Sequence, residues 1–352
     1  MSPPDIADPA ADTADPVFAS RWLERGRKMH LRFPWLLPVI SFAVGWLSFF
    51  LFQRGEGLAR FIAVVALIGW PWLLAENVLG RLILARSGGR FNIGVVRFVT
   101  QQIQQEILFF ALPFLIGATQ AHFGQIIFSG IAVLVALALT LDPIYLHRIA
   151  PHRGLSTAVH GYCTFIAALV VLPVALHMPL DEALPLSLLI TAGTLLAGLP
   201  RMLLSVSGWR MRLGGTLALL LSLVLLWLVH SWVPAAGFWV RDARVTNSII
   251  QLQPSVSLQT FSPRDLAGGG VVAFVAVRAP TGLAQDVVFE WRHKGKVLDS
   301  IPARISGGRE EGFRTYSRKQ NFPADPIGNW RVDLITPQRQ VIARIRFEVV
   351  GE

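Results

Sequence analysis

The chain has 352 residues, of which 53% are hydrophobic and 15% are charged. Soluble globular proteins carry about 25% charged residues, so this composition argues against a chain that is soluble throughout its length. The formal net charge of +10 does not indicate a nucleic-acid-binding protein, because the basic residues before position 240 lie mostly between apolar runs, where they meet lipid headgroups. The single cysteine, Cys163, excludes an intrachain disulfide and a cysteine-based zinc site.

Residues 1–33 predict a disordered tail that becomes basic toward its end. Pro, Ala and Asp dominate the first 20 positions without an apolar period, and Arg and Lys follow. A cleaved signal peptide would place basic residues first and a short apolar stretch after them. Here the acidic segment comes first, so the apolar run after Arg32 is interpreted as a retained membrane span.

Seven segments within residues 34–239 are predicted to be membrane-spanning helices. A spanning helix needs about 20 apolar residues, because each residue adds about 1.5 Å toward a hydrocarbon core of about 30 Å. We therefore expect an all-α membrane bundle of about seven transmembrane helices. The predicted spans are Pro34–Phe52, Leu58–Leu79, Ile103–Ala118, Gln125–Leu141, Leu155–Leu176, Ala183–Leu199 and Gly215–Val233.

The links between these spans predict the orientation. The N-terminal tail and the second, fourth and sixth links together hold 14 Arg and Lys residues, whereas the other links hold only Arg54 and Arg60. Basic links stay in the cytoplasm, so the N-terminus is predicted to be cytoplasmic and the C-terminus to lie outside. In a Gram-negative cell that compartment is the periplasm. Aromatic residues at the exit of the last span, among them Phe238 and Trp239, are interpreted as an interfacial belt.

From about Val240 the sequence period changes, which predicts a small soluble domain, all-β and sandwich-like, over residues 240–352. Five short runs rich in β-branched and aromatic residues are bounded by Gly, Pro and Asn. In one of them Trp330, Val332 and Leu334 alternate with charged residues, so these three side chains are expected to point into the core. The runs cover residues 271–279, 287–294, 313–319, 329–336 and 341–350.

Part of this domain resembles a known family. Residues 290–295 (EWRHKG), 314–319 (RTYSRK) and 328–333 (GNWRVD) resemble a bacterial C-terminal domain of unknown function, which is often attached to a multi-span inner-membrane region. Members tend to have a glycine in the final hairpin turn, whereas this chain has residues 337–340 (PQRQ) there. The family has no established activity, so the resemblance implies no functional residue.

Polar residues at the predicted cytoplasmic ends of the central helices form a first candidate site. Glu76, Glu106, Asp142 and His160 recur at one predicted depth on adjacent helices. Carboxylates and histidines within a membrane domain usually face the bundle interior, where they could bind a metal ion, relay protons or hold a polar headgroup. The alternative, which we prefer, is that they decorate the headgroup level and hydrogen-bond neighbouring helices. Their spacing matches no metal motif, so no metal site is predicted.

A second candidate site lies in the soluble domain. Arg314, Tyr316 and Arg318, together with Trp291, combine guanidinium and aromatic groups that suit a glycan or an anionic headgroup. A solvated face on a basic domain explains the same residues equally well. The sequence contains no nucleophile elbow, phosphate-binding glycine loop, HExxH motif or paired-carboxylate signature, so no catalytic residue and no cofactor are predicted.

These observations predict an inner-membrane protein without enzymatic activity, whose helical bundle anchors a periplasmic β domain that binds a partner in the cell envelope. The expected partners are membrane lipids and either a periplasmic protein or an envelope glycan, and no nucleic acid is expected. An alternative of another class stays open, namely a membrane enzyme or transporter that acts on a lipid or a small solute through the Glu/Asp/His cluster. The sequence predicts neither the ligand nor the oligomeric state.

Overall fold

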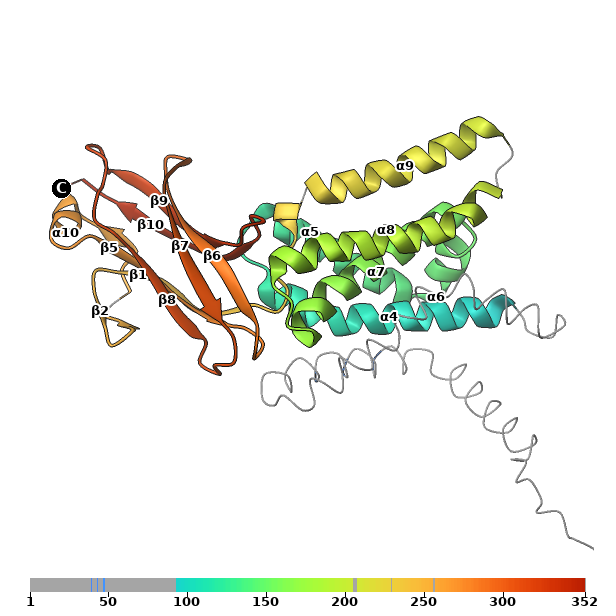
Figure 1. Cartoon of the computed structure of the whole chain (residues 1–352), viewed down its shortest axis with the longest axis horizontal. Coiled ribbons are helices and arrows are strands. Elements are labelled where there is room, and N and C mark those ends of the chain that lie inside the picture. Colours follow the sequence, from blue (N-terminus) through green and yellow to red (C-terminus); the bar gives the residue numbers. More distant parts are fainter. Residues whose placement is uncertain are drawn as a thin grey trace, which may run out of the picture.

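The computed structural model describes residues 93–351 apart from 205–207, 229 and 256, and only Val39, Ala43 and Leu47 before them. The predicted tail and the predicted spans 34–52 and 58–79 therefore lie outside the described residues, those three positions excepted. The described chain forms a helical domain followed by a β domain, which lies at one end of the helices (Figure 1). The C-terminus lies on the side of the β domain that points away from the helices (Figure 1).

The helical domain is built from long helices joined by short links. Pro143 lacks the N–H group that would continue α5, and it lies in the first turn of the short helix α6 instead. Helix α4 packs against α5 and α7, α7 packs against α8, and α8 packs against α9. The bounds are α4 Ile93–Ala118, α5 Phe123–Thr140, α6 Asp142–Ile144, a π-helical turn Tyr145–Ile149, α7 Arg153–Ala175, α8 Leu180–Leu204, α9 Trp209–Leu228 and a 3-10 turn His230–Trp232.

The prediction of a seven-span helical bundle is wrong. Within the described residues, two helical segments are long and apolar enough to cross a membrane, namely α5 and residues Gly154–Ala175 of α7. Helix α4 includes a glutamine-rich stretch at residues 101–106, which shortens its apolar part. Parts of α8 and α9 carry side chains outside the described part of the chain, and within α9 a shorter apolar segment covers Arg212–Leu225.

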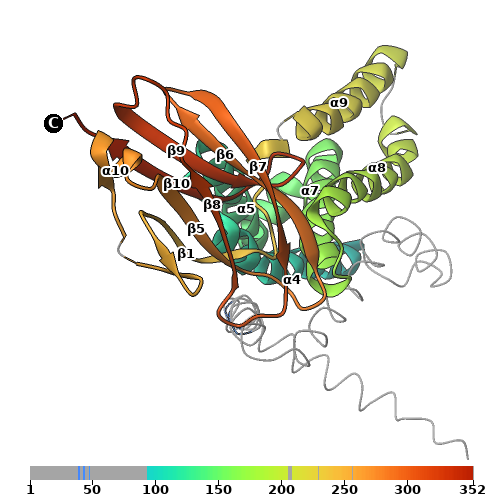
Figure 2. The same ribbon diagram turned by 60° about the vertical axis from the view of Figure 1, so that its left-hand side comes forward.

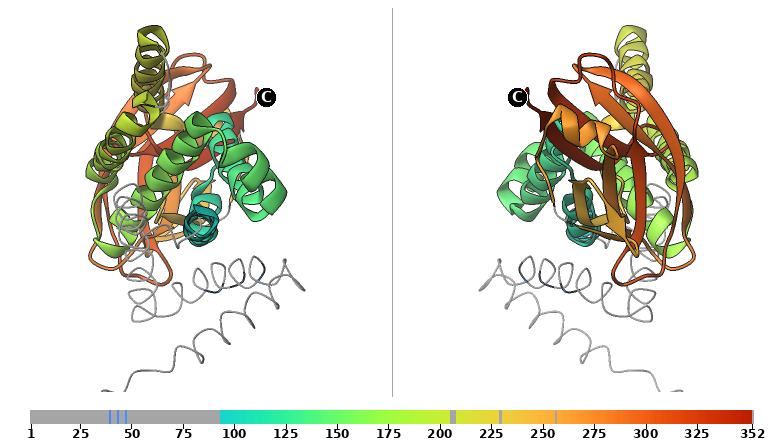
Figure 3. Two further views of the ribbon diagram at one scale, coloured as in Figure 1. Left: turned by 90° about the vertical axis from the view of Figure 1, so that its right-hand side faces the viewer. Right: turned by 90° about the vertical axis from the view of Figure 1, so that its left-hand side faces the viewer.

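The two candidate spans differ in their surroundings. In α7, 83% of the most apolar 18-residue stretch within Gly154–Ala175 is buried inside the protein, as in an ordinary core helix, whereas only 39% of α5 is buried. Large apolar side chains of α5 are exposed, and Leu134 is 66% exposed. Helix α9 lies at the margin of the helical domain (Figure 3) and exposes Leu221 to 68%. The helical domain therefore presents apolar side chains outward along α5 and α9.

The β domain contains two sheets that face each other across a hydrophobic core (Figure 2), which confirms the predicted C-terminal β domain. The three-stranded sheet has the order β1-β5-β8, and the five-stranded sheet has the order β4-β10-β9-β6-β7. Neighbouring strands are antiparallel except β4 and β10. The bounds are β1 Trp239–Thr246, β4 Thr260–Phe261, β5 Val271–Arg278, β6 Ala284–His293, β7 Lys296–Ser306, β8 Phe313–Lys319, β9 Gly328–Ile335 and β10 Val341–Val349, with a β2–β3 ribbon (Ile249–Ile250, Gln253–Pro254) and a short helix α10 (Pro263–Ala267) between β1 and β5.

The alternation predicted for residues 330–334 is confirmed, because Trp330, Val332 and Leu334 are all buried in the core between the sheets. The Trp330 ring stacks on Phe347 with 5.9 Å between ring centroids, and on its other side it stacks on His293 at 4.4 Å. Its indole N–H donates to the Pro326 carbonyl oxygen at 2.8 Å. The core thus satisfies the polar atom of a large aromatic residue while removing its ring from water.

Candidate functional site

The junction between the two domains is a continuous core. Along residues 233–239, side chains alternate between two hydrophobic clusters: Val233, Ala236 and Trp239 pack with the helices, whereas Ala235 and Phe238 pack with the β domain. The predicted interfacial belt is therefore corrected for Phe238 and Trp239, which are buried inside the protein. The two domains share apolar contacts and cannot separate without exposing them.

Side-chain amides cross this junction. Gln125, in the first turn of α5, donates through Nε2 to the Val341 carbonyl oxygen at 2.9 Å. Gln285, at the start of β6, accepts from the Leu180 backbone N–H at 2.6 Å and donates to Asp181 Oδ1 at 3.0 Å. Since Leu180 begins α8, these bonds tie the beginnings of two helices to two strands of the five-stranded sheet. Buried bonds of this kind fix the relative orientation of the domains.

The fit at the junction is also steric. A Cβ atom at Gly124 would lie 2.3 Å from the Trp232 ring, so only glycine permits this contact. Gln340, in the β9–β10 turn, is buried and donates to the carbonyl oxygens of Val233 and Pro234, each at 3.4 Å. The β domain is thus held against the helices at several separate points.

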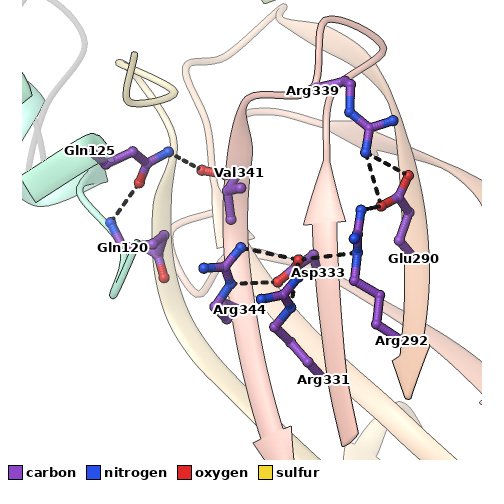
Figure 4. Close-up of polar contacts among 9 residues, drawn as sticks. All are labelled: Gln120, Gln125, Glu290, Arg292, Arg331, Asp333, Arg339, Val341 and Arg344. Atoms are coloured by element: carbon purple, nitrogen blue, oxygen red, sulfur yellow. Dashed lines mark hydrogen bonds and ion pairs between the residues drawn. The ribbon is translucent and has the colours of Figure 1, made fainter. Parts of the chain in front are cut away.

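A network of arginines and carboxylates lies on the outer face of the five-stranded sheet, close to the junction (Figure 4). Its centre is Asp333, which is 3% exposed. Arg344 donates to both of its carboxylate oxygens, at 2.6 and 3.1 Å. The Nε atoms of Arg331 and Arg292 lie 3.1 and 3.8 Å from Asp333 Oδ2. One buried carboxylate therefore serves three guanidinium groups.

A second carboxylate extends the network across the sheet. Glu290 accepts from Arg292 Nη2 at 2.6 Å, and Arg339 Nη2 lies 3.4 Å from both of its carboxylate oxygens (Figure 4). Arg339 lies in the β9–β10 turn with a φ of +62°, a left-handed conformation that costs a non-glycine residue about 1–2 kcal/mol. The turn holds a strained arginine at the position where a glycine would be free of strain.

Strand register places three arginines side by side. Arg331 on β9 pairs with Arg292 on β6 and with Arg346 on β10, so three cations stand in one row across the sheet. Burial lowers the pKa of Arg331, and neighbouring Arg344, Arg292 and Arg346 lower it further against the opposing effect of Asp333. Like charges directly opposite each other are destabilising, and Asp333, 3.1 Å from Arg331 Nε, offsets only part of this repulsion.

His122 connects the network to the helical domain. It lies in the α4–α5 link, directly before the first residue of α5, Phe123. Burial lowers the pKa of His122, and the charges of Arg344 and Arg331 contribute in the same direction while Asp333 opposes them. The histidine therefore lies within electrostatic reach of the arginines. Since His122 directly precedes α5, the arginine network lies close to the start of α5.

The predicted helical cluster is brought together only in part. Asp142 accepts from Gln101 Nε2 at 2.8 Å, and His160 Nδ1 lies 3.3 Å from Gln104 Nε2. Glu106 is exposed, whereas His160 is buried, and Glu76 lies outside the described residues. Within the described part of the chain, no three His, Cys, Asp or Glu residues gather closely enough to hold a metal ion. Asp142 and His160 are held by α4 glutamines three residues apart.

Of the four residues predicted for the second candidate site, three lie together on one face of β8. Arg314, Tyr316 and Arg318 alternate along β8 with more deeply buried residues, and Tyr316 is exposed. Trp291 is fully buried instead, and its indole N–H donates to Ser317 Oγ at 2.9 Å. The alternation of Phe289 and Trp291 with the charged residues of β6 was the signal that could have placed this ring in the core.

Two family models match separate regions of the chain. A model described as a family of unknown function (DUF5924) matches residues 17–273, nearly three quarters of the chain. The chain belongs to the DUF5924 family. A second model, described as a protein of unknown function (DUF2914), matches residues 284–349. No curated protein and no solved structure matches.

The two family models meet inside the β domain rather than at its edge. DUF5924 extends through β1 and into β5, whereas DUF2914 covers β6 to β10. The three-stranded sheet therefore takes β1 and the start of β5 from one matched region and β8 from the other. In this DUF5924 member, the sandwich needs both regions to close its core.

Proposed function

We propose that this DUF5924 protein is an integral protein of the bacterial inner membrane, in which the helical domain holds the β domain against the outer surface of the bilayer. The proposal rests on the apolar side chains that α5 and α9 turn outward. In water, an exposed apolar surface this continuous would drive aggregation, whereas in lipid it is the expected lining. The exposed residues include Phe123, Ile126, Ile131, Leu134 and Leu137 on α5, and Leu213, Leu217, Leu220, Leu221, Val224, Leu225 and Leu228 on α9.

Charge placement supports the orientation. The links beside the β domain, residues 119–122 and 176–179, contain no Arg or Lys. The opposite ends of the helices carry the basic residues, among them Arg148, Arg153, Arg210 and Arg212. Basic residues flanking membrane helices stay in the cytoplasm, so the β domain faces the periplasm under this proposal.

The built junction supports an anchoring role. A β domain on a flexible tether would show few contacts with its anchor, whereas here a shared core and buried amide bonds join the two. The helical domain then fixes the height and the tilt of the β domain above the bilayer. The β domain acts as a binding module for a ligand or partner at the membrane surface.

Two measurements on cells test this proposal. The full chain should stay in the membrane fraction after a carbonate wash, because its apolar helices are embedded rather than bound by charge. A C-terminal alkaline phosphatase fusion should be active and a C-terminal green fluorescent protein fusion should be dark. Release by carbonate would contradict the embedded helical domain, and a bright fluorescent fusion with inactive phosphatase would contradict the orientation.

A second candidate function is a membrane transporter or enzyme that uses the polar interior of the helical domain. One observation favours it: both amide atoms of Gln105, and the carbonyl oxygens of Gln101 and Gln104, are buried without a hydrogen-bond partner among the described residues. Polar groups without partners inside a membrane domain often mark a path for a solute or a proton.

The two candidates differ in which variants abolish the cellular phenotype. For a transporter or enzyme, His160→Ala and Gln104→Leu should each abolish it at normal expression levels. For an anchor, both variants should behave like the parent protein, and deletion of residues 240–352 should give the full loss.

A further inference from the structure

We propose that the outer face of the five-stranded sheet binds the phosphate of an anionic phospholipid headgroup. The binding surface, here called the arginine face, consists of Arg292, Arg331, Arg339, Arg344 and Arg346. This inference rests on the proposed membrane location and adds the ligand class that the β domain recognises there.

The charge balance of this face favours an anion. Five arginines surround two carboxylates, Glu290 and Asp333, and Glu348 pairs in register with Asn329 one row beyond Arg346. Asp286, farther along β6, is paired with Arg304. With all of these groups ionised, the face keeps a net positive charge. Asp333 is shared by several guanidinium groups, so it neutralises only part of the charge around it.

The guanidinium groups retain donors for a ligand. Each guanidinium carries five N–H groups in a fixed fork that matches phosphate oxygens. Arg331 contacts Asp333 through Nε alone, and Arg346 is exposed without a carboxylate within 4 Å among the described residues. These two arginines are direct cross-strand neighbours, so one phosphate can accept from both.

The backbone conformation of Arg339 also supports anion binding by the arginine face. Its left-handed φ costs stability that a glycine at this position would not lose. The strained residue nevertheless contacts Glu290, which is already paired with Arg292. Residues in strained backbone conformations that add little to the stability of the fold are often found at ligand-binding positions.

The position of the arginine face favours a lipid as the source of the phosphate. Val341 is bonded to Gln125 in the first turn of α5, and Arg346 lies five residues farther along β10, about 17 Å along the strand. The strands run obliquely to the helices (Figure 1), so the height of Arg346 above the start of α5 is smaller than this distance. The headgroup layer extends roughly 5–8 Å beyond the hydrocarbon core on each side. A phospholipid whose chains follow the exposed Phe123 and Ile126 therefore carries its phosphate toward the arginine face, which begins at Arg339 beside Val341.

The test uses the full chain in a neutral detergent with phosphatidylglycerol, phosphatidylcholine or inorganic phosphate as the probe. Native mass spectrometry should show retained phosphatidylglycerol, and thermal unfolding should show stabilisation by it. The double variant Arg331→Gln, Arg346→Gln leaves the Asp333–Arg344 pair intact, and it should weaken phosphatidylglycerol binding at least about tenfold. Arg314→Gln, Arg318→Gln, on the opposite sheet, is the matched control and should bind like the parent.

Arg339→Gly separates binding from folding. It removes one cation and relieves the left-handed strain, so it should weaken phosphatidylglycerol binding several-fold without lowering the melting temperature. Equal retention of phosphatidylglycerol by the parent and the Arg331/Arg346 variant would overturn the proposal, and so would equal retention of phosphatidylcholine. Inorganic phosphate that binds as tightly as the lipid, with the same dependence on arginine, would overturn the lipid source. Retention of the chain in the membrane fraction after a carbonate wash tests the proposed membrane location separately, because that measurement does not depend on binding of phosphatidylglycerol, phosphatidylcholine or inorganic phosphate.

Discussion

Both domains have an apolar core, but their outer surfaces differ. In the β domain, Trp291, Trp330 and Phe289 fill the interior and arginines lie outside, whereas in the helical domain leucines of α5 and α9 face outward and Gln101 and Gln105 are buried. The surface of a protein domain reflects its solvent, so under the proposed membrane location the helices meet lipid and the β domain meets water.

The largest expected contrast comes from removing one tryptophan from each domain. Trp330→Ala should cost about 3–5 kcal/mol, because it empties a stacked and hydrogen-bonded position in the core. Trp209→Ala, at a residue of α9 that is 70% exposed, should change stability by less than about 0.5 kcal/mol. Chemical unfolding of the full chain in detergent measures both. A large loss of stability in Trp209→Ala would contradict the difference between the two domains.

A buried-charge test gives the next largest effect. Leu134→Lys near the middle of α5 should disfavour membrane insertion by about 2.5–3.5 kcal/mol, since the ammonium group would lie in hydrocarbon. Ile250→Lys, at an exposed position of the β domain, should be tolerated because it meets water. Protein levels in carbonate-washed membranes report the difference. Normal insertion of the Leu134 variant would mean that α5 faces water.

The junction is tested with two glycines of the same helix. Gly124→Ala forces the Trp232 ring to move and should cost about 1–3 kcal/mol. Gly130→Ala meets nothing within 4 Å and should be neutral or stabilising by up to about 1 kcal/mol. Limited proteolysis between the domains, together with the melting temperature, distinguishes the variants. Identical behaviour would show that the domains are not tightly docked at Trp232.

The smallest expected effect is a dependence on pH at His122. Its pKa in the folded protein is lowered from 6.5, mainly by burial and by Arg344, so the unfolded chain binds the proton more readily. Stability from this site is therefore complete above pH 6.5 and declines as the pH falls below it. The melting temperature of the parent should drop more between pH 7.5 and pH 5.5 than that of His122→Gln. Parallel curves would remove His122 from the electrostatic environment of the arginine face.

Local periodicity predicted much of the β domain. The five predicted runs correspond to β5, β6, β8, β9 and β10, because each alternates or is uniformly apolar over several residues. Strand β7 gave no such signal, since it contains Pro302 and is largely exposed at the sheet edge. Strand β1 was also missed, because charged residues interrupt its apolar positions.

The candidate site residues show which features local sequence patterns can predict and which depend on tertiary structure. At about 100° per residue, Gln101, Gln104 and Gln105 share one face of α4, whereas Glu106 points about 140° away from Gln101. Its exposure could have been predicted from that geometry. The arginine face could not, because the row of Arg292, Arg331 and Arg346 exists only through the register of β9 with β10 and with β6, which is distant from both in sequence.

The central claim is that α5 and α9 face lipid while the β domain faces water, and spin labels test it most directly. Cys163 is fully buried and can be replaced with Ala, which allows single labels at Leu134, Leu221 and Tyr316. In phospholipid vesicles, the labels at Leu134 and Leu221 should collide more with oxygen than with a water-soluble nickel chelate, and the label at Tyr316 should show the reverse. Equal or greater access of the nickel chelate at Leu134 and Leu221 would contradict the account.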